Sequence, residues 1–404
     1  MNKSPWRSIA LRTFTYSYMA KITQRKSFRY IHLFIGLVAG IIVFIEAITG
    51  SLWVFHDEID ALLHEDIVVQ AKEAPFVTPS QVKVIAGEAI PGKAIHGVLY
   101  PNSNHQPLEI IFYEEDPEFY TSLFIDPYSG DVLKKEDHLK GFFAFVLDGH
   151  LHLWLPEEIG KPIVSYGTLL FLISIITGIV LWWPKNKKGL RQRIKFDWRN
   201  GVRWRRKNFD LHTVLGFYVS AVAFIFVITG LVMALNWFYF IYYKGFGGER
   251  EPQFLIPNNE KEYVEKTNET APIDRLPEVL MSRYPDAKDY EIHYPYADSV
   301  SIYVEVSYQD ITYYDSDYLF FDQSTLEEVP TTSIYGRRSE ADLADQMIRM
   351  NYDIHVGTIF GLPTKILAFL ASLTIATLPV TGVLLYLGRI RKSRRNTLAL
   401  SRAI

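Results

Sequence analysis

The sequence predicts a membrane protein of the α+β class, in which a bundle of four transmembrane helices carries two small α+β domains outside the membrane. Three observations support this prediction. Apolar runs long enough to cross a bilayer alternate with long polar segments, and the mean hydropathy of the 404 residues is close to zero. Acidic and basic residues occupy different segments. The second half of the chain also repeats the order of features in the first half.

The four predicted spans are apolar stretches, and the second of them ends in Leu-Trp-Trp-Pro, aromatic residues suited to the membrane interface. The spans cover residues 30–55, 163–184, 211–240 and 355–388. The segments between and around them cover residues 1–29, 56–162, 185–210, 241–354 and 389–404. The chain is thus expected to cross the membrane four times, with both termini on the same side.

The charge distribution predicts which side that is. Of the 42 Lys and Arg residues, 24 lie in the two terminal segments and the loop 185–210, together with only two acidic residues. The two long polar segments hold 42 of the 45 acidic residues. Because loops rich in Lys and Arg stay on the cytoplasmic side, the termini are predicted to be cytoplasmic and the acidic segments to lie outside.

Each acidic segment predicts a small α+β domain. In the first, the pattern predicts a helix over 78–90, strands over 94–100, 108–113 and 121–125, and a turn over 126–130. In the second, it predicts a helix over 272–284 and strands over 290–293, 299–307 and 318–321. The shared order indicates a tandem duplication of a unit made of a helix, an outer domain and a second helix.

Two histidines occupy equivalent positions in the first and third spans. His32-x3-Gly-x12-Thr-Gly recurs with the same spacing as His212-x3-Gly-x12-Thr-Gly. Neutral imidazoles on facing helices commonly hold a b-type haem, and an ionisable group inside a membrane is a candidate for function. His32 and His212 are therefore predicted to be the axial ligands of a haem near the cytoplasmic side. The alternative is two interfacial histidines that bond to headgroups or backbone.

A second pair of histidines is expected near the outer side of the membrane. His355 precedes the apolar part of the fourth span, and His150 and His152 precede the second span. His150 with His355 is the preferred pair for a second haem, and His152 is the alternative to His150. Two residues apart, His150 and His152 cannot share one helix face. The competing interpretation places them on the surface of the outer domain.

The absence of cysteine excludes covalently attached haem, thiolate iron–sulfur clusters and disulfides.

A Thr-Gly pair occurs in each span, ending at Gly50, Gly178, Gly230 and Gly382. Residues 32 and 49 are 17 positions apart, about 25 Å of helix. In an antiparallel bundle, Gly178 and Gly382 are thus expected at the level of the inner histidines, and Gly50 and Gly230 at the level of the outer ones. Glycine at these points would let a porphyrin approach the backbone, while close packing of helices is an equally good explanation.

Two further sets of charged residues are candidates. Glu46 and Lys365 are predicted at similar depths within the membrane, which suggests an ion pair or, alternatively, a proton relay. Arg29, Arg205 and Arg206 lie near the inner histidines and could bind haem propionates, although the positive-inside rule alone also explains them. Nucleic acid is not expected as a partner, since the basic stretches flank membrane spans.

The motifs together resemble a known family. Residues 126–133, Asp-Pro-Tyr-Ser-Gly-Asp-Val-Leu, resemble the end of a PepSY domain. The Gly178-x2-Leu-Trp-Trp-Pro, Asp-Leu-His212 and Ile-His355-x-Gly motifs resemble the PepSY-associated transmembrane family, over residues 28–390. The family's ligand position resembles His-x2-Leu-x-Leu, which His150 fits. The two outer domains are then PepSY-like.

The resemblance implies a multi-pass protein of the bacterial inner membrane, with periplasmic outer domains and b-type haem, two per chain by the histidine count. It implies a ferric-chelate reductase that takes electrons from the quinol pool or a cytoplasmic flavoprotein and releases ferrous iron from a siderophore. One alternative is a PepSY module without redox activity that regulates or senses a periplasmic protease or ligand. Another is a siderophore transporter.

Overall fold

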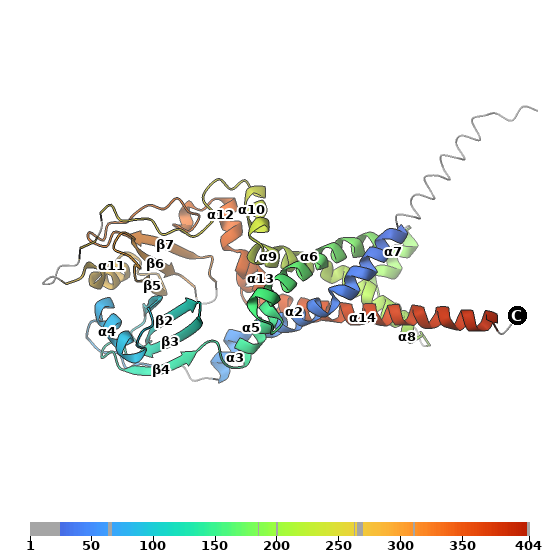
Figure 1. The fold of residues 1–404 in the computed structure, drawn as a ribbon, viewed down its shortest axis with the longest axis horizontal. Helices are drawn as coiled ribbons and strands as arrows, with labels where there is room; N and C mark the ends of the chain where they lie inside the picture. The colour runs from blue at the N-terminus through green and yellow to red at the C-terminus, as the bar shows by residue number, and fades with distance from the viewer. Residues whose placement is uncertain are drawn as a thin grey trace, which may run out of the picture.

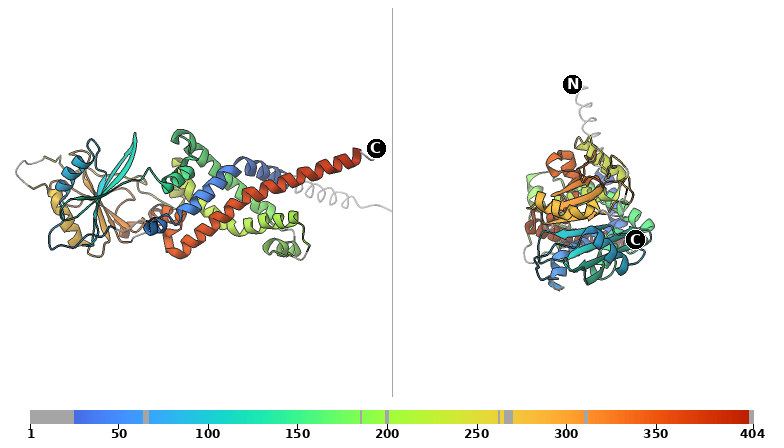
Figure 2. Two further views of the ribbon diagram at one scale, coloured as in Figure 1. Left: turned by 90° about the horizontal axis from the view of Figure 1, so that it is seen from below. Right: turned by 90° about the vertical axis from the view of Figure 1, so that its left-hand side faces the viewer.

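The computed structural model describes residues 25–63, 67–184, 186–198, 201–261, 263–264, 270–309 and 312–401. A bundle of long helices occupies one end of the elongated molecule and a β-sheet with its covering helices occupies the other (Figure 1). The first described helix begins, and the chain ends, at the end of the bundle that lies away from the sheet (Figures 1 and 2). The bundle and the sheet therefore form two layers along one axis.

The bundle contains the apolar helices that the sequence predicts. Its elements are the helix Arg25–Val38, α2 (Gly40–Trp53), α6 (Glu157–Trp182), α8 (Trp204–Asp210), the π-helix η1 (Leu211–Leu215), α9 (Gly216–Ala234) and α14 (Leu362–Ser401). In the described part of the chain, three helical stretches are long and apolar enough to cross a membrane: Glu157–Trp182, Trp204–Ala234 and Leu362–Arg391. The pair Arg25–Val38 and Gly40–Trp53 gives a fourth if it is one span.

The first predicted span is bent rather than straight. The helix Arg25–Val38 meets α2 at an angle of 58°. A Cβ on Gly40 would lie 3.4 Å from the Cβ of Pro379 in α14, so the bend lies against this proline. Buried alanines and valines fill the space between the helices, among them Ala39, Val43 and Ala223. Small side chains let helix backbones approach closely where lipid supplies no hydrophobic driving force.

The described residues outside the bundle contain seven strands, and all seven belong to one antiparallel sheet of order β4-β3-β2-β1-β5-β6-β7. The first acidic segment supplies β1 (Gly97–Pro101), β2 (Leu108–Glu115), β3 (Glu118–Ile125) and β4 (Val132–Asp137). The second supplies β5 (Asp289–His293), β6 (Ile302–Ser307) and β7 (Ser316–Phe321). Each predicted strand is present, with ends displaced by a few residues.

The prediction of two domains assumes that the two outer segments are separate. In the structure they are joined. Strand β1 of the first pairs with β5 of the second along their whole length, with Gly97 opposite His293 and Pro101 opposite Asp289. Figure 2 shows the two sets of strands side by side in one layer. An unpaired edge strand exposes a row of backbone N–H and C=O groups, and this pairing satisfies them. The outer part of the protein is consequently one sheet domain.

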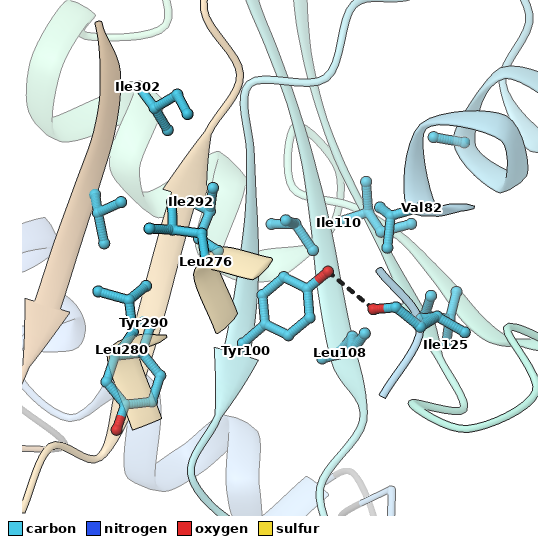
Figure 3. Packing of buried hydrophobic residues seen from close by; sticks show 14 of the residues in the cluster. Val82, Tyr100, Leu108, Ile110, Ile125, Leu276, Leu280, Tyr290, Ile292 and Ile302 are labelled. Carbon is cyan, nitrogen blue, oxygen red and sulfur yellow. Dashed lines mark hydrogen bonds between the residues drawn. The ribbon is translucent and has the colours of Figure 1, made fainter. Parts of the chain in front are cut away.

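One hydrophobic core covers one face of the sheet from β3 to β7. Helix α4 (Pro79–Ala89) covers the first half and α11 (Leu276–Arg283), preceded by the 3₁₀ turn η2 (Pro272–Arg275), covers the second. Tyr100 and Ile292, from neighbouring strands, are fully buried in this core (Figure 3). The Tyr100 hydroxyl donates a hydrogen bond of 3.0 Å to the carbonyl of Val77, which satisfies its polar atom.

The opposite, more polar face of the sheet carries carboxylates beside aromatic side chains and is turned toward the bundle (Figure 1). Successive strand residues point to opposite faces, so Glu291 and Glu305, which lie side by side on β5 and β6, both leave the core. Tyr318 of β7 lies opposite Glu305 of β6. The guanidinium of Arg349 lies 5.1 Å from the ring centre of Tyr318. Arg349 ends α12 (Leu343–Arg349), one of the helices between the sheet and the bundle (Figure 1).

Short helices that the sequence does not predict connect the layers. They are α3 (His56–Leu63), α5 (Phe142–His152), α10 (Asn236–Gly245), α12 and α13 (Asn351–Val356). Helix α7 (Lys187–Ile194) lies at the far end of the bundle. Two single turns, η3 (Arg338–Glu340) and η4 (Thr358–Phe360), complete the set. Gly357 has φ +87°, and a Cβ there would lie 2.8 Å from the carbonyl oxygen of Thr364. The chain turns sharply here, so His355 lies on α13 and not at the start of a span over 355–388.

The continuous sheet makes a prediction about stability. The side chain of Ile292 is fully buried at the centre of the shared core. Ile292→Ala should cost about 2–5 kcal/mol, because it removes buried methyl groups and leaves a cavity. The measurement is thermal unfolding of the full chain in detergent. Val84→Ala in α4, where the side chain is 63% exposed, is the control. Equal losses for both variants would contradict the assigned core.

Candidate functional site

Four histidines form two pairs, one at each end of the bundle. His32, from the helix Arg25–Val38, faces His212 of η1 with ring centroids 6.3 Å apart and planes at 69°. His150 of α5 faces His355 of α13, also with centroids 6.3 Å apart and planes at 60°. The structure therefore brings together the residues predicted as an inner and an outer pair.

A threonine holds each histidine of the inner pair. The Nδ1 atom of His32 lies 3.1 Å from Oγ1 of Thr177 and 3.0 Å from the carbonyl oxygen of Ser174, both in α6. Nδ1 of His212 lies 2.9 Å from Oγ1 of Thr381 in α14. These threonines belong to the Thr-Gly pairs that the spacing argument expects at the inner level, so that prediction of depth is confirmed.

The outer pair has the same arrangement. Nδ1 of His150 lies 3.1 Å from Oγ1 of Thr49 and 3.1 Å from the carbonyl oxygen of Glu46, both in α2. Nδ1 of His355 lies 2.8 Å from Oγ1 of Thr229 in α9. The predicted outer level of these two Thr-Gly pairs is confirmed as well.

The threonines determine which imidazole nitrogen carries the proton. Each hydroxyl donates its own hydrogen to a carbonyl one turn back in its helix, as Thr49 does to Ile45 (2.7 Å) and Thr177 does to Ile173 (2.9 Å). The hydroxyl oxygen then accepts a hydrogen bond, which requires Nδ1–H on the histidine. Nε2 is left with its lone pair, the form in which a histidine binds a metal.

The glycine after each threonine makes room for the imidazole. A Cβ on Gly178 would lie 3.2 Å from Cε1 of His32, and one on Gly50 would lie 3.2 Å from Cε1 of His150. The corresponding distances are 3.3 Å for Gly230 with His355 and 3.4 Å for Gly382 with His212. The space beside these four glycines is thus filled by histidine rings. The four glycines therefore affect the position of the histidine rings. The sequence had suggested a different role, the direct approach of a porphyrin to the backbone.

The spacing of both pairs fits a metal ion between two imidazoles. With metal–nitrogen bonds of about 2 Å and about 1.1 Å from each nitrogen to its ring centre, two imidazoles on opposite sides of one ion have centroids about 6 Å apart. The observed 6.3 Å agrees. A cavity of about 380 Å³, lined largely by apolar side chains, adjoins His32 and His212. Its volume suits a cofactor site. The residues present therefore fit a haem at the inner pair.

The cations around this cavity differ in part from those expected. Arg29 lines it, as do Arg193 and Arg389, which the sequence did not single out. Arg205 and Arg206 are not among the lining residues, and Arg206 forms an ion pair of 2.9 Å with Asp210. Arg29, Arg193 and Arg389 are thus the guanidinium groups that line the cavity, and that of Arg193 also donates to the carbonyls of Leu181 and Trp182.

His152 lies apart from the histidine pairs. Its Nδ1 is 3.1 Å from a carboxylate oxygen of Asp148, one turn back in α5. His150, two residues earlier, is the one that faces His355. Of the two alternatives, the structure brings His150 to the outer pair.

The proposed contact between Glu46 and Lys365 is wrong. The carboxylate of Glu46 accepts a hydrogen bond of 2.9 Å from Thr168, because Glu46 faces α6. Lys365 forms an ion pair of 2.7 Å with Glu58 in α3, near the sheet side of the bundle. Lys365 is 2% exposed, so this partner compensates a buried charge.

Two asparagines support the histidines of the second half. The Nδ2 atom of Asn208 donates to the carbonyl of Thr381 (3.1 Å), and that of Asn351 donates to the carbonyl of Thr229 (3.1 Å). Each asparagine precedes its histidine by four residues, so the repeated spacing Asn-x3-His was a signal in the sequence. The π-helix that carries His212 had no such signal, although short π-helices often mark functional sites.

A second cavity, of about 620 Å³, is lined by residues of α9, α10, α12 and α13, among others. Its lining includes Asn351, which precedes His355 by one helical turn, and the cation Arg349. Five tyrosines also line it: Tyr239, Tyr313, Tyr318, Tyr335 and Tyr352. The cavity combines hydrogen-bonding hydroxyl groups, aromatic faces and one guanidinium, a set that suits an aromatic or anionic ligand.

The fold and these sites define a helical membrane protein with two histidine pairs and one extramembrane sheet domain. The chain belongs to the PepSY-associated TM region family, whose pattern matches residues 29–389. This confirms the resemblance noted in the sequence. The comparison with curated proteins finds no match.

The glycine contacts give a test of the haem hypothesis. Gly178→Val should displace His32, because its Cβ alone would stand 3.2 Å from the ring and its methyl groups would extend further. We expect bound haem, measured as the pyridine haemochrome, to fall from two to one per chain. Gly245→Val is the control, since no atom lies within 4 Å of a Cβ at that position. Unchanged haem content in Gly178→Val would contradict the role assigned to this glycine.

Proposed function

We propose that the protein passes electrons across the bacterial inner membrane and reduces ferric iron held in siderophore or other chelates on the side of the sheet domain. The observation that carries this proposal is the pair of matched histidine sites, one at each end of the bundle, with 6.3 Å between the imidazole centroids of each. Ferrous iron binds hard oxygen ligands less tightly than ferric iron, so one electron would release it from the chelate.

Two haems of the b type would supply one-electron couples at these sites. The chain's own residues would fix their positions. The imidazoles are held by hydrogen bonds from Nδ1 to threonine, which leave Nε2 for the iron. Arg29, Arg193 and Arg389 would pair with the propionates of the inner haem. Histidines 212 and 355 lie near opposite ends of α9, about 25 Å apart by helix length.

The orientation follows from charge. The parts of the basic segments that the structure describes lie at the end of the bundle away from the sheet, and Lys and Arg favour the cytoplasmic side. The sheet domain would then be periplasmic and both termini cytoplasmic, with four crossings. The inner haem would take electrons from the quinol pool or from a cytoplasmic flavoprotein. A tandem duplication of a helix–strands–helix unit would account for the matched Thr-Gly pairs.

The tyrosine-lined cavity is the proposed docking site for the chelate. It adjoins Asn351, one turn before His355, so a chelate there would lie close to the outer haem. Arg349 supplies a positive charge for an anionic chelate, and the tyrosine rings supply stacking surfaces. Substrate binding and electron transfer would thus meet at one end of the bundle.

The ligand assignment predicts the haem content of single variants. His212→Ala and His355→Ala should each retain one haem per chain, because each removes one ligand of one pair. His152→Ala is a matched control in the same helix as His150 and should retain two. The measurement combines the pyridine haemochrome with reduced-minus-oxidised spectra of the purified protein. Two haems in His212→Ala, or none in the unaltered protein after expression with ample haem, would refute the assignment.

A single-turnover experiment tests the direction of transfer. The protein is reduced with dithionite, freed of excess reductant without oxygen, and mixed with a ferric chelate and a ferrous-specific dye. We expect each oxidised haem to yield one ferrous ion. His355→Ala should slow reoxidation of the remaining haem by at least about 100-fold, a barrier increase of roughly 2.7 kcal/mol. His212→Ala should keep a rapid phase of one ferrous ion. Rapid reoxidation of His355→Ala would show that the outer site is not the exit.

A further inference from the structure

Three potential metal ligands converge where the two halves of the sheet meet. His96, Glu291 and His293 each offer one ligand atom, and these atoms all lie within 4.8 Å of one another. The rings of His96 and His293 have centroids 4.9 Å apart with planes at 89°. Oε1 of Glu291 lies 3.2 Å from Nε2 of His293. The cluster is separate from the histidine pairs of the bundle.

The pairing of β1 with β5 creates this cluster. His96 immediately precedes β1, whereas Glu291 and His293 are alternate residues of β5 on the polar face. Gly97 lies opposite His293 and Leu99 opposite Glu291. One ligand thus comes from the first half of the chain and two from the second, so the site requires the continuous sheet.

Gly97 leaves the space that the cluster occupies. A Cβ at this position would lie 2.7 Å from Oε1 of Glu291 and 3.2 Å from Cε1 of His293. The first distance is shorter than real Cβ contacts, so any other residue would force the carboxylate to move. The glycine therefore allows the carboxylate to take its observed position.

His293 is oriented as a metal-binding histidine is. Its Nδ1 lies 3.1 Å from the carbonyl oxygen of His96 and donates its proton there. The ring of Tyr303 stacks on it at 4.3 Å and 22°. Its Nε2 is buried and, among the described residues, has no partner with hydrogen-bond geometry. A histidine that donates one N–H to a carbonyl and presents the other nitrogen unprotonated is the usual metal ligand.

The electrostatics of the cluster favour a cation. Burial, and then the neighbouring His96, lower the pKa of His293 to about 3, and burial also lowers the pKa of His96. Burial, and then the neighbouring Glu305 and Glu109, raise the pKa of Glu291 to about 8. Several carboxylates therefore gather on this face of the sheet, and a cation among them would reduce their mutual repulsion. His96 is exposed, which leaves one side of the cluster open to solvent.

We propose that His96, Glu291 and His293 form a binding site for a divalent transition-metal ion. Two imidazoles and one carboxylate with open coordination positions form the set that suits Fe²⁺. The site lies on the polar face of the sheet, the face turned toward the bundle. Fe²⁺ is also the ion that the proposed reductase would release. The identity of the ion, but not the existence of the site, rests on that proposed function.

Metal binding to the full chain tests the site. The protein is purified in detergent without a polyhistidine tag and dialysed to equilibrium against Co²⁺, and the bound cobalt is counted by elemental analysis. Cobalt serves as the probe because it is distinguished from haem iron. We expect one Co²⁺ per chain, lost in His293→Ala and in Glu291→Gln, which keeps the shape of the side chain. His105→Ala, an exposed histidine elsewhere in the sheet domain, is the control and should retain the ion.

A second variant leaves all three ligands in place. Gly97→Ala should weaken Co²⁺ binding by about 10- to 100-fold, the range for residues that position metal ligands. Equal cobalt binding in the unaltered protein, Glu291→Gln and His293→Ala would overturn the proposal, as would the absence of binding to the unaltered protein. Unchanged haem spectra and melting temperatures in each variant would exclude misfolding as the cause.

Displacement of cobalt by Fe²⁺ without oxygen tests the identity of the ion. Displacement at similar concentrations would support Fe²⁺, whereas resistance to Fe²⁺ would overturn that identity. The single-turnover assay separates this result from the proposed function. Loss of cobalt binding in His293→Ala with intact ferric reduction would establish the site as distinct from the reductase. Cobalt binding in a protein that reduces no ferric chelate would leave the site standing without the reductase.

Discussion

The hydrogen bond between a threonine hydroxyl and the Nδ1 atom of a histidine is the interaction on which the arrangement of the bundle depends. It occurs four times, with distances between 2.8 and 3.1 Å, and each time a glycine beside the threonine admits the ring. Helix packing and side-chain orientation are thereby coupled. A helix that slid by one turn would move the threonine away from its histidine and place a residue larger than glycine against the imidazole.

The continuous sheet is the second constraint, because it fixes the two outer histidine-bearing helices relative to each other. Asp353 of α13 is fully buried and accepts hydrogen bonds from the backbone N–H groups of Tyr313 and Tyr314, as well as 2.7 Å from the Thr358 hydroxyl. These bonds tie the helix that carries His355 to the strand region of the second half. Since β1 joins β5, the first half is held in the same frame.

The sequence predicted the features that depend on helical rise and left out those that depend on contacts between distant segments. The depths of the Thr-Gly pairs followed from 1.5 Å per residue. The union of the two outer segments required knowing that β1 and β5 are neighbours. The similar depths predicted for Glu46 and Lys365 suggested a pair. The two side chains instead point to different neighbours, Glu46 to Thr168 and Lys365 to Glu58. Tertiary structure alone brings Arg193 and Arg389 to the inner cavity. It alone also forms the cluster of His96, Glu291 and His293.

The two ends of the bundle differ chemically although their histidine pairs match. The guanidinium groups of Arg29, Arg193 and Arg389 line the inner cavity, and a guanidinium can pair with a carboxylate through two parallel hydrogen bonds. Near the outer end, five tyrosines line the second cavity together with a single guanidinium, that of Arg349, and tyrosine hydroxyls can hydrogen-bond to a chelate. A cofactor with carboxylate arms is better retained at the inner end, whereas a small charged ligand is better exchanged at the outer one. Matched histidine pairs thus stand in chemically different surroundings at the two ends of the bundle.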